Sequence, residues 1–129
     1  MPLSSNAGAA VFGKILKAKT AAYTVLASED GVIFTNEGAT ASVAFTLPAV
    51  ANNAIPIGFE CTFYGLSAYG FSVASNGSAD NIVAKNDAAA DSITCTSTSL
   101  MIGAAVRVIW SGTKWLSFAD SSGPTYTIA

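Results

Sequence analysis

The stretch VAFTLP, residues 43–48, decides the fold class of this chain. Its three larger apolar residues alternate with Ala44 and Thr46, and a period of two places them on one face of a β-strand. Pro48 ends the strand because its nitrogen has no hydrogen to donate to a neighbouring strand. The stretch therefore predicts a strand with one buried face.

Similar short runs recur along the rest of the chain. They are rich in β-branched and aromatic residues, and Gly, Asn, Asp and Ser separate them. We expect one all-β domain over residues 21–129, an antiparallel β-sandwich of the jelly-roll type. The expected strands are Tyr23–Ala27, Val32–Asn36, Ser42–Leu47, Phe59–Tyr64, Phe71–Ala74, Asn81–Val83, Ser92–Thr96, Ala105–Trp110, Lys114–Ala119 and Thr125–Ile128.

Turn residues support this strand count. Asp30-Gly31 and Asn36-Glu37-Gly38 separate the first runs, and residues 111–114 join the two tryptophan-bearing runs as a short hairpin. The segment Lys85–Asp91 is ambiguous because its three consecutive alanines are compatible with a helical turn. We expect it to be a surface loop.

The composition predicts self-association. Charged residues make up 11% of the chain, against about 25% in an average protein, and hydrophobic residues make up 51%. So few charges leave apolar surface for another copy or another protein to cover. The uncharged run 38–59 contains Pro48, Pro56 and two asparagines, so we expect no membrane span. A net charge of −2 argues against a nucleic-acid partner.

Residues 1–20 are expected to form a flexible N-terminal arm. The first ten residues are small and polar and lack the pattern of a secretory signal, which predicts synthesis in the cytoplasm. The segment that follows contains half of the six basic residues, at Lys14, Lys17 and Lys19, around Ile15 and Leu16. One interpretation is a segment that docks on an acidic partner, and the other is a solvated leader with one edge strand.

Catalytic chemistry is not expected. The chain has no histidine, which removes the commonest general base and metal ligand. Its eight carboxylates fall mostly in predicted turns, and no calcium loop or phosphate-binding glycine motif is present. We predict no catalytic residue, no metal and no cofactor. Cys61 and Cys95 lie in expected strands and are expected to stay reduced in the cytoplasm.

Two residue pairs are candidates for a subunit interface. Glu60 and Arg107 each interrupt an apolar strand, so they are expected to pair across neighbouring strands or between subunits. Trp110 and Trp115 flank a short hairpin, where core packing or subunit contact is favoured. The alternative is a stacking platform for sugars, which would make the chain a carbohydrate-binding module.

The order D-x-G, F-x-N-x-G-A-T and F-T-L-P, which runs from Asp30 to Pro48, resembles β-rich modules of tailed-bacteriophage virion proteins. Such modules occur in capsid decoration (cement) proteins and in tail fibres, and Lys114-Trp115-Leu116 looks like their closing strand. The resemblance covers roughly Tyr23 to Phe118.

The resemblance implies a virion component that is usually trimeric, with no enzymatic residues. We expect a homotrimeric cement protein, made in the host cytoplasm, that binds the major capsid protein on the outer capsid surface. Fibre proteins of this type are long, so a chain of 129 residues favours the cement protein. A tail-fibre or receptor-binding module is the alternative.

Overall fold

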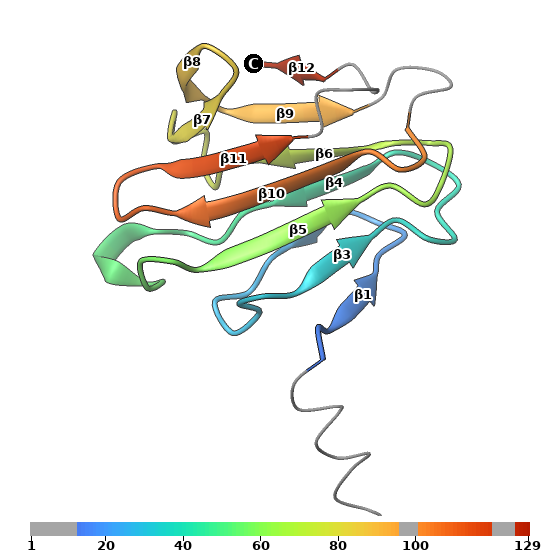
Figure 1. Ribbon diagram of the computed structural model, residues 1–129, viewed down its shortest axis with the longest axis horizontal. Coiled ribbons are helices and arrows are strands. Elements are labelled where there is room, and N and C mark those ends of the chain that lie inside the picture. Colours follow the sequence, from blue (N-terminus) through green and yellow to red (C-terminus); the bar gives the residue numbers. More distant parts are fainter. Residues whose placement is uncertain (1–12, 96–100, 120–125) are drawn as a thin grey trace, which may run out of the picture.

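The structure is a computed structural model and describes residues 13–95, 101–119 and 126–129. It confirms a single all-β domain in which two sheets pack as a sandwich. In Figure 1 the strands of sheet A cross the front of the molecule, with β6 and β4 of sheet B behind them. Sheet A has the order β1-β3-β5-β10-β11-β7-β8, and sheet B has the order β12-β9-β6-β4-β2.

The strands are short, and all but β1 and β8 lie within or close to the expected runs. Sheet A consists of β1 (Leu16–Ala18), β3 (Ile33–Thr35), β5 (Glu60–Tyr64), β10 (Ala105–Trp110), β11 (Trp115–Ala119), β7 (Ile82–Ala84) and β8 (Asp87–Ala90). Sheet B consists of β12 (Thr127–Ile128), β9 (Ser92–Cys95), β6 (Phe71–Ala74), β4 (Val43–Thr46) and β2 (Tyr23–Thr24). A 3-10 turn, η1 (Ala51–Asn53), precedes β5.

The sheets are mixed, so the antiparallel expectation was wrong in this respect. From β1 to β6 the chain alternates between sheet A and sheet B, and β1, β3 and β5 pair in parallel, as do β2, β4 and β6. The turns at Asp30-Gly31 and Asn36–Gly38 carry the chain from one sheet to the other rather than back along the same sheet. Antiparallel pairing appears only from β5–β10 and β6–β9 onward, for example in the β10–β11 hairpin.

Aromatic rings from both sheets form the centre of the core. Phe34 of β3 stacks on Phe63 of β5, with ring centroids 5.6 Å apart. Phe45 of β4 reaches across from sheet B to within 4.9 Å of the Phe63 ring centroid, and Phe71 of β6 packs against Phe45. All four side chains are buried. The alternation in residues 43–48 therefore has the predicted consequence, because Val43, Phe45 and Leu47 all face the core.

A buried asparagine holds two sheet-crossing turns together. Oδ1 of Asn36 accepts hydrogen bonds from the backbone nitrogens of Leu66 and Ser67, at 2.7 and 2.8 Å. Its Nδ2 donates to the carbonyl oxygen of Gly70 at 3.0 Å. Gly70 is itself constrained, since its φ is +79° and an added Cβ would lie 2.2 Å from the carbonyl oxygen of Cys95. The Asn in the F-x-N-x-G motif is therefore a buried structural residue and not only a turn former.

One other expectation about an element needs correction, and one of the two interpretations of the arm is supported. The segment Lys85–Asp91 is not a loop, because β8 pairs antiparallel with β7 through a turn in which Lys85 and Asn86 both have positive φ. The predicted arm also contributes a strand, since β1 within residues 1–20 pairs with β3 at the edge of sheet A. Residues 1–12 of that arm lie outside the described residues.

Candidate interaction surface

The three lysines of the predicted docking segment all contact residues of their own chain. Lys17 lies on β1, and its Nζ is 2.6 Å from Oε2 of Glu29. The Lys19 ammonium lies 3.8 Å from the centre of the Tyr23 ring, a cation–π contact. Nζ of Lys14 lies 3.7 Å from Oε1 of Glu60. The edge-strand interpretation therefore describes residues 16–18, and Lys14 is the most exposed charge of the three.

Glu29 is a buried carboxylate, only 2% exposed, in the segment between β2 and β3. Besides Lys17, it accepts hydrogen bonds from the hydroxyl of Tyr23 and from the backbone nitrogen of Leu26, at 2.8 Å each to Oε1. Burial acts to raise the pKa of Glu29, but these donors and the lysine charge outweigh it and hold the pKa below its usual value. The Glu29 cluster has a structural role, because all these partners of Glu29 lie in β1, in β2 or in the segment between β2 and β3.

The predicted pair of Glu60 and Arg107 is confirmed between neighbouring strands. Glu60 lies on β5 and Arg107 on β10, with Arg107 opposite Thr62 in the register. Nη1 of Arg107 is 3.8 Å from Oε2 of Glu60, an ion pair without a hydrogen bond. Both side chains are partly exposed on the outer surface of sheet A.

Trp110 and Trp115 belong to the core, so their assignment to a subunit interface was wrong. Trp110 is 6% exposed and Trp115 is fully buried, with ring centroids 5.2 Å apart. Phe59 packs edge-on against Trp115. The same burial removes the two tryptophans from any sugar-stacking platform, because neither ring face is open to a ligand. The hairpin spacing was compatible with core packing or with subunit contact, and the burial of both rings shows that they pack in the core.

The outward residues of sheet A form a charge-poor apolar surface, which we name the A face. One row crosses five strands in register, and Glu60 begins a second row toward the turn between β10 and β11. The first row is Leu16, Ile33, Thr62, Arg107 and Phe118, and the second is Glu60, Ile109, Leu116 and Val83. Leu16, Phe118 and Leu116 are 64%, 50% and 39% exposed. Leu116 and Phe118 are neighbours on β11, and exposed apolar side chains of this size are normally covered when they lie together.

The outward residues of sheet B, which we name the B face, have a different character. Register places Thr127, Thr94, Ser72 and Ala44 in one row and Ser92, Ala74, Thr46 and Thr24 in the next. These side chains are small, and those that are polar carry hydroxyls that water can solvate. The two faces of the sandwich therefore differ in polarity. The A face, with its large exposed apolar side chains, is the better candidate for contact with another protein.

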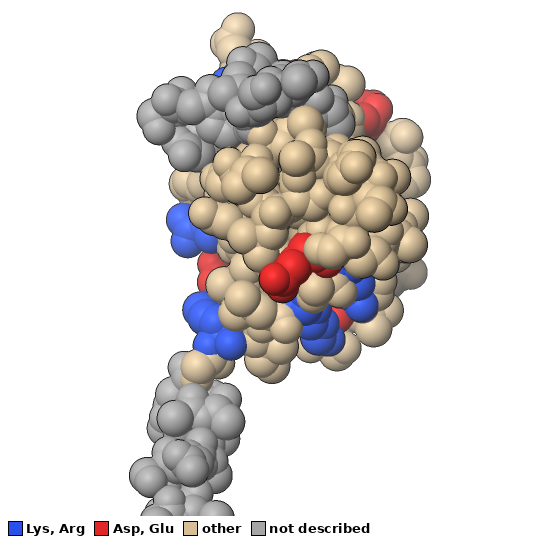
Figure 2. All heavy atoms as spheres, turned by 90° about the vertical axis from the view of Figure 1, so that its right-hand side faces the viewer, with Lys and Arg blue, Asp and Glu red and all other residues tan. Residues whose placement is uncertain are grey.

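Charge is also scarce at the end of the sandwich that is on the right in Figure 1. Figure 2 looks directly at this end and shows a mostly uncharged surface, with most of the Lys, Arg, Asp and Glu atoms in its lower half. Leu66, Tyr69 and Ile102 are exposed loop residues, and Tyr64 at the end of β5 is 39% exposed. The two tyrosines remain accessible, unlike the tryptophans.

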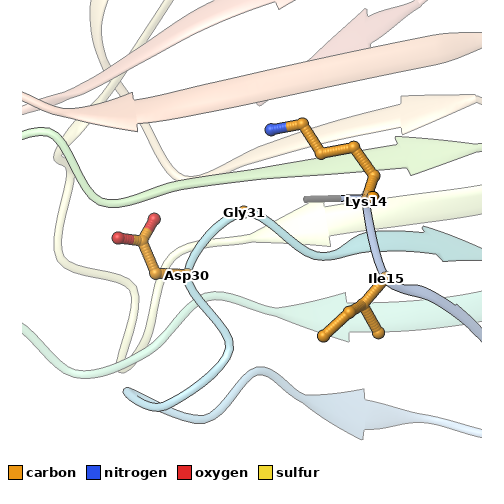
Figure 3. A pocket seen from close by; sticks show the side chains of 5 residues that line it. Lys14, Ile15, Asp30 and Gly31 are labelled. Carbon is orange, nitrogen blue, oxygen red and sulfur yellow. The ribbon is translucent and has the colours of Figure 1, made fainter. Parts of the chain in front are cut away.

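A pocket of about 230 Å³ lies beside the start of β1. It is lined by Gly13, Lys14, Ile15, Asp30 and Gly31, and Figure 3 shows the side chains of Lys14 and Ile15 extending to opposite sides. Oδ1 of Asp30 is already used, since it accepts a hydrogen bond from the backbone nitrogen of Glu60 at 2.9 Å. The pocket lies between the start of the edge strand β1 and the turn at Asp30-Gly31. Asp30, its one acidic residue, is engaged in a hydrogen bond that stabilises the fold.

Within the described ranges, no three His, Cys, Asp or Glu residues lie close enough together to hold a metal ion. The same residues contain no helix of the length and apolar character that a membrane crossing needs. Cys61 is buried on β5, and burial followed by the charges of Asp30, Glu29 and Glu60 raises the pKa of its thiol. That thiol is therefore a poor nucleophile.

The sequence singled out Glu60 and Arg107 but missed the apolar residues around them. The signal was present in WLSFA, residues 115–119, where Leu116 and Phe118 alternate with Trp115 and so must point away from the core. A strand with large apolar residues on both faces is typical of one that is covered on both sides. Comparison of the chain with protein-family models and with curated protein sequences found no match.

Proposed function

We propose that this chain is a non-enzymatic structural protein of a tailed-bacteriophage virion. In this proposal it is a decoration (cement) protein that binds the outer surface of the capsid as a homotrimer and stabilises the shell. The A face is the observation that carries the proposal, because an apolar surface across a rigid sheet suits contact between proteins. The virion assignment itself rests on the sequence resemblance.

The mechanism we propose is avidity. An assembly of several copies contacts the shell at several places at once, so weak individual contacts add up to stable binding. The edge of sheet A offers a contact region to the major capsid protein, since Lys14 and Ile15 are exposed there. Lys17 and Lys19 are held by close partners within the chain, whereas Lys14 is largely exposed and only 3.7 Å from Glu60, so the contact relies on Ile15 and on Lys14.

The test uses virions produced with and without this chain. We expect the chain to co-purify with intact capsids, and capsids that lack it to release their DNA at a lower temperature. Adding the purified chain back should restore the heat resistance. The variant Ile15→Ser should bind capsids more weakly, with Leu26→Ser as a matched control at another exposed apolar residue. Recovery of the chain with tails instead of heads would make it a tail-fibre module and would refute the proposal.

A further inference from the structure

The charged groups on the A face form only long ion pairs within one chain. Arg107 and Glu60 are 3.8 Å apart, which is longer than a hydrogen bond. Lys14 approaches the other oxygen of Glu60 only to 3.7 Å. The guanidinium of Arg107 has five N–H donors, and its other contact in the described part of the chain is the Phe118 ring, 4.8 Å away. Both groups therefore keep hydrogen-bonding capacity toward a partner.

These two charges lie within an apolar surround. Arg107 lies on β10, and on the neighbouring strand β11 Phe118 lies opposite Arg107 and Leu116 lies opposite Ile109. Leu16 and Ile33 continue the row of Arg107 to the edge of the sheet. Ion pairs gain strength when apolar groups around them exclude water. A partner that covered Leu16, Leu116 and Phe118 would at the same time shield the pair of Arg107 and Glu60 from solvent.

We propose that the partner of the A face is a second copy of this chain. In the proposed trimer the A faces of neighbouring copies pack together, and Arg107 of each copy pairs with Glu60 of the next. This inference rests on the self-association included in the proposed function, but it does not depend on a capsid.

Charge complementarity points to the occupant. In the two outward rows Arg107 is the one cation and Glu60 the one anion, with Lys14 beside them at the edge of the sheet, so the surface presents both signs of charge to a second copy. A partner of strong single charge would repel one of the two groups. A purely apolar partner would leave both charges buried with only their long, weak pairing. A second copy provides both the apolar cover and the matching charges.

The experiment measures molar mass by light scattering during size-exclusion chromatography, over a range of protein concentrations. The wild-type chain should run as a multiple of its 13.0 kDa monomer mass. Arg107→Glu and Glu60→Arg should each weaken association by about tenfold or more, because like charges then face each other. The double variant, in which the two charges are exchanged, should restore association. Phe118→Ser should weaken it, while the B-face control Thr94→Glu should not.

Thermal melting of each variant checks that it is folded, so that loss of mass reports on the interface. A wild-type chain that stays at 13.0 kDa would overturn the inference. Single charge reversals that associate as the wild type does, or a Thr94→Glu variant that dissociates as strongly as Phe118→Ser, would overturn it as well. If these variants all associate normally and the chain still binds capsids, the inference fails and the proposed function stands.

Discussion

The ammonium of Lys17 lies 2.6 Å from Oε2 of Glu29, and the hydroxyl of Tyr23 binds the same carboxylate. One buried acid thus joins β1, β2 and the segment that leads into β3. Lys17, which the sequence pattern assigned to a docking arm, is part of this cluster. The N-terminal edge of the sandwich is therefore held by a polar cluster as well as by apolar packing.

Removal of the carboxylate should destabilise the fold. Glu29→Ala leaves the Tyr23 hydroxyl and the Leu26 N–H without their acceptor and Lys17 without its counter-ion. We expect the free energy of unfolding to fall by about 2–4 kcal/mol, measured by urea denaturation. Glu37→Ala, at an exposed turn, is the control and should change it by less than about 0.5 kcal/mol. Equal effects of the two variants would contradict the structural role of Glu29.

The same cluster predicts a dependence of stability on pH. The pKa of Glu29 is held below its usual 4.5, so the unfolded chain binds a proton at this group more readily than the folded chain does. The stabilisation is therefore fully present above that usual value and is lost as the pH falls through the lower folded-state pKa. We expect the urea midpoint of the wild type to drop more steeply below about pH 5 than that of Glu29→Gln. Parallel acid profiles for the two proteins would be inconsistent with a lowered pKa.

The buried tryptophans predict a distinct fluorescence. Because Trp110 and Trp115 lie in the core, the native protein should emit at short wavelength and acrylamide should quench it weakly. Unfolding should shift the emission to longer wavelength and make quenching efficient. Strong quenching in the native state would place a tryptophan on the surface and would reopen the sugar-platform alternative.

Two glycines form a matched pair for a test of close packing. Gly70 and Gly77 have similar φ values, +79° and +70°, so alanine costs about 1 kcal/mol of backbone strain at either position. At Gly70 the new Cβ would also lie 2.7 Å from the sulfur of Met101 and still closer to the carbonyl of Cys95, whereas no atom lies within 4 Å at Gly77. Thermal melting should therefore show a much larger loss for Gly70→Ala. Similar losses would mean that the backbones do not approach so closely.

Local pattern was enough to predict most of the strands, β1 and β8 excepted, but not their connections. The alternation in residues 43–48 predicts which side chains are buried, because strand geometry has a fixed period. Glycine and asparagine predict where the chain turns, yet a turn within one sheet and a turn between two sheets use the same residues. The parallel pairing of β1, β3 and β5 depends on that choice, which is made by packing between distant segments.

Only part of the candidate surface could be predicted, because local pattern does not show which distant segments pack together. Glu60 and Arg107 were visible because a charge in an apolar strand is unusual, and their pairing follows from strands that are neighbours in the sheet. The role of Lys17 was not visible, since nothing local indicates that Glu29, twelve residues later, is buried beside it. The burial of Trp110 was likewise not settled by the hairpin spacing, which fits a core position and a subunit contact equally well.

Electron cryo-microscopy of the virions that contain this chain tests the central claim most directly. The account predicts density for the sandwich on the outer capsid surface, in clusters whose copies meet through the A face around Arg107 and Phe118. Capsid-bound copies that meet through the B face would contradict the proposed interface alone. Density for the chain at the tail, or none on the outer capsid surface, would contradict its assignment as a decoration protein.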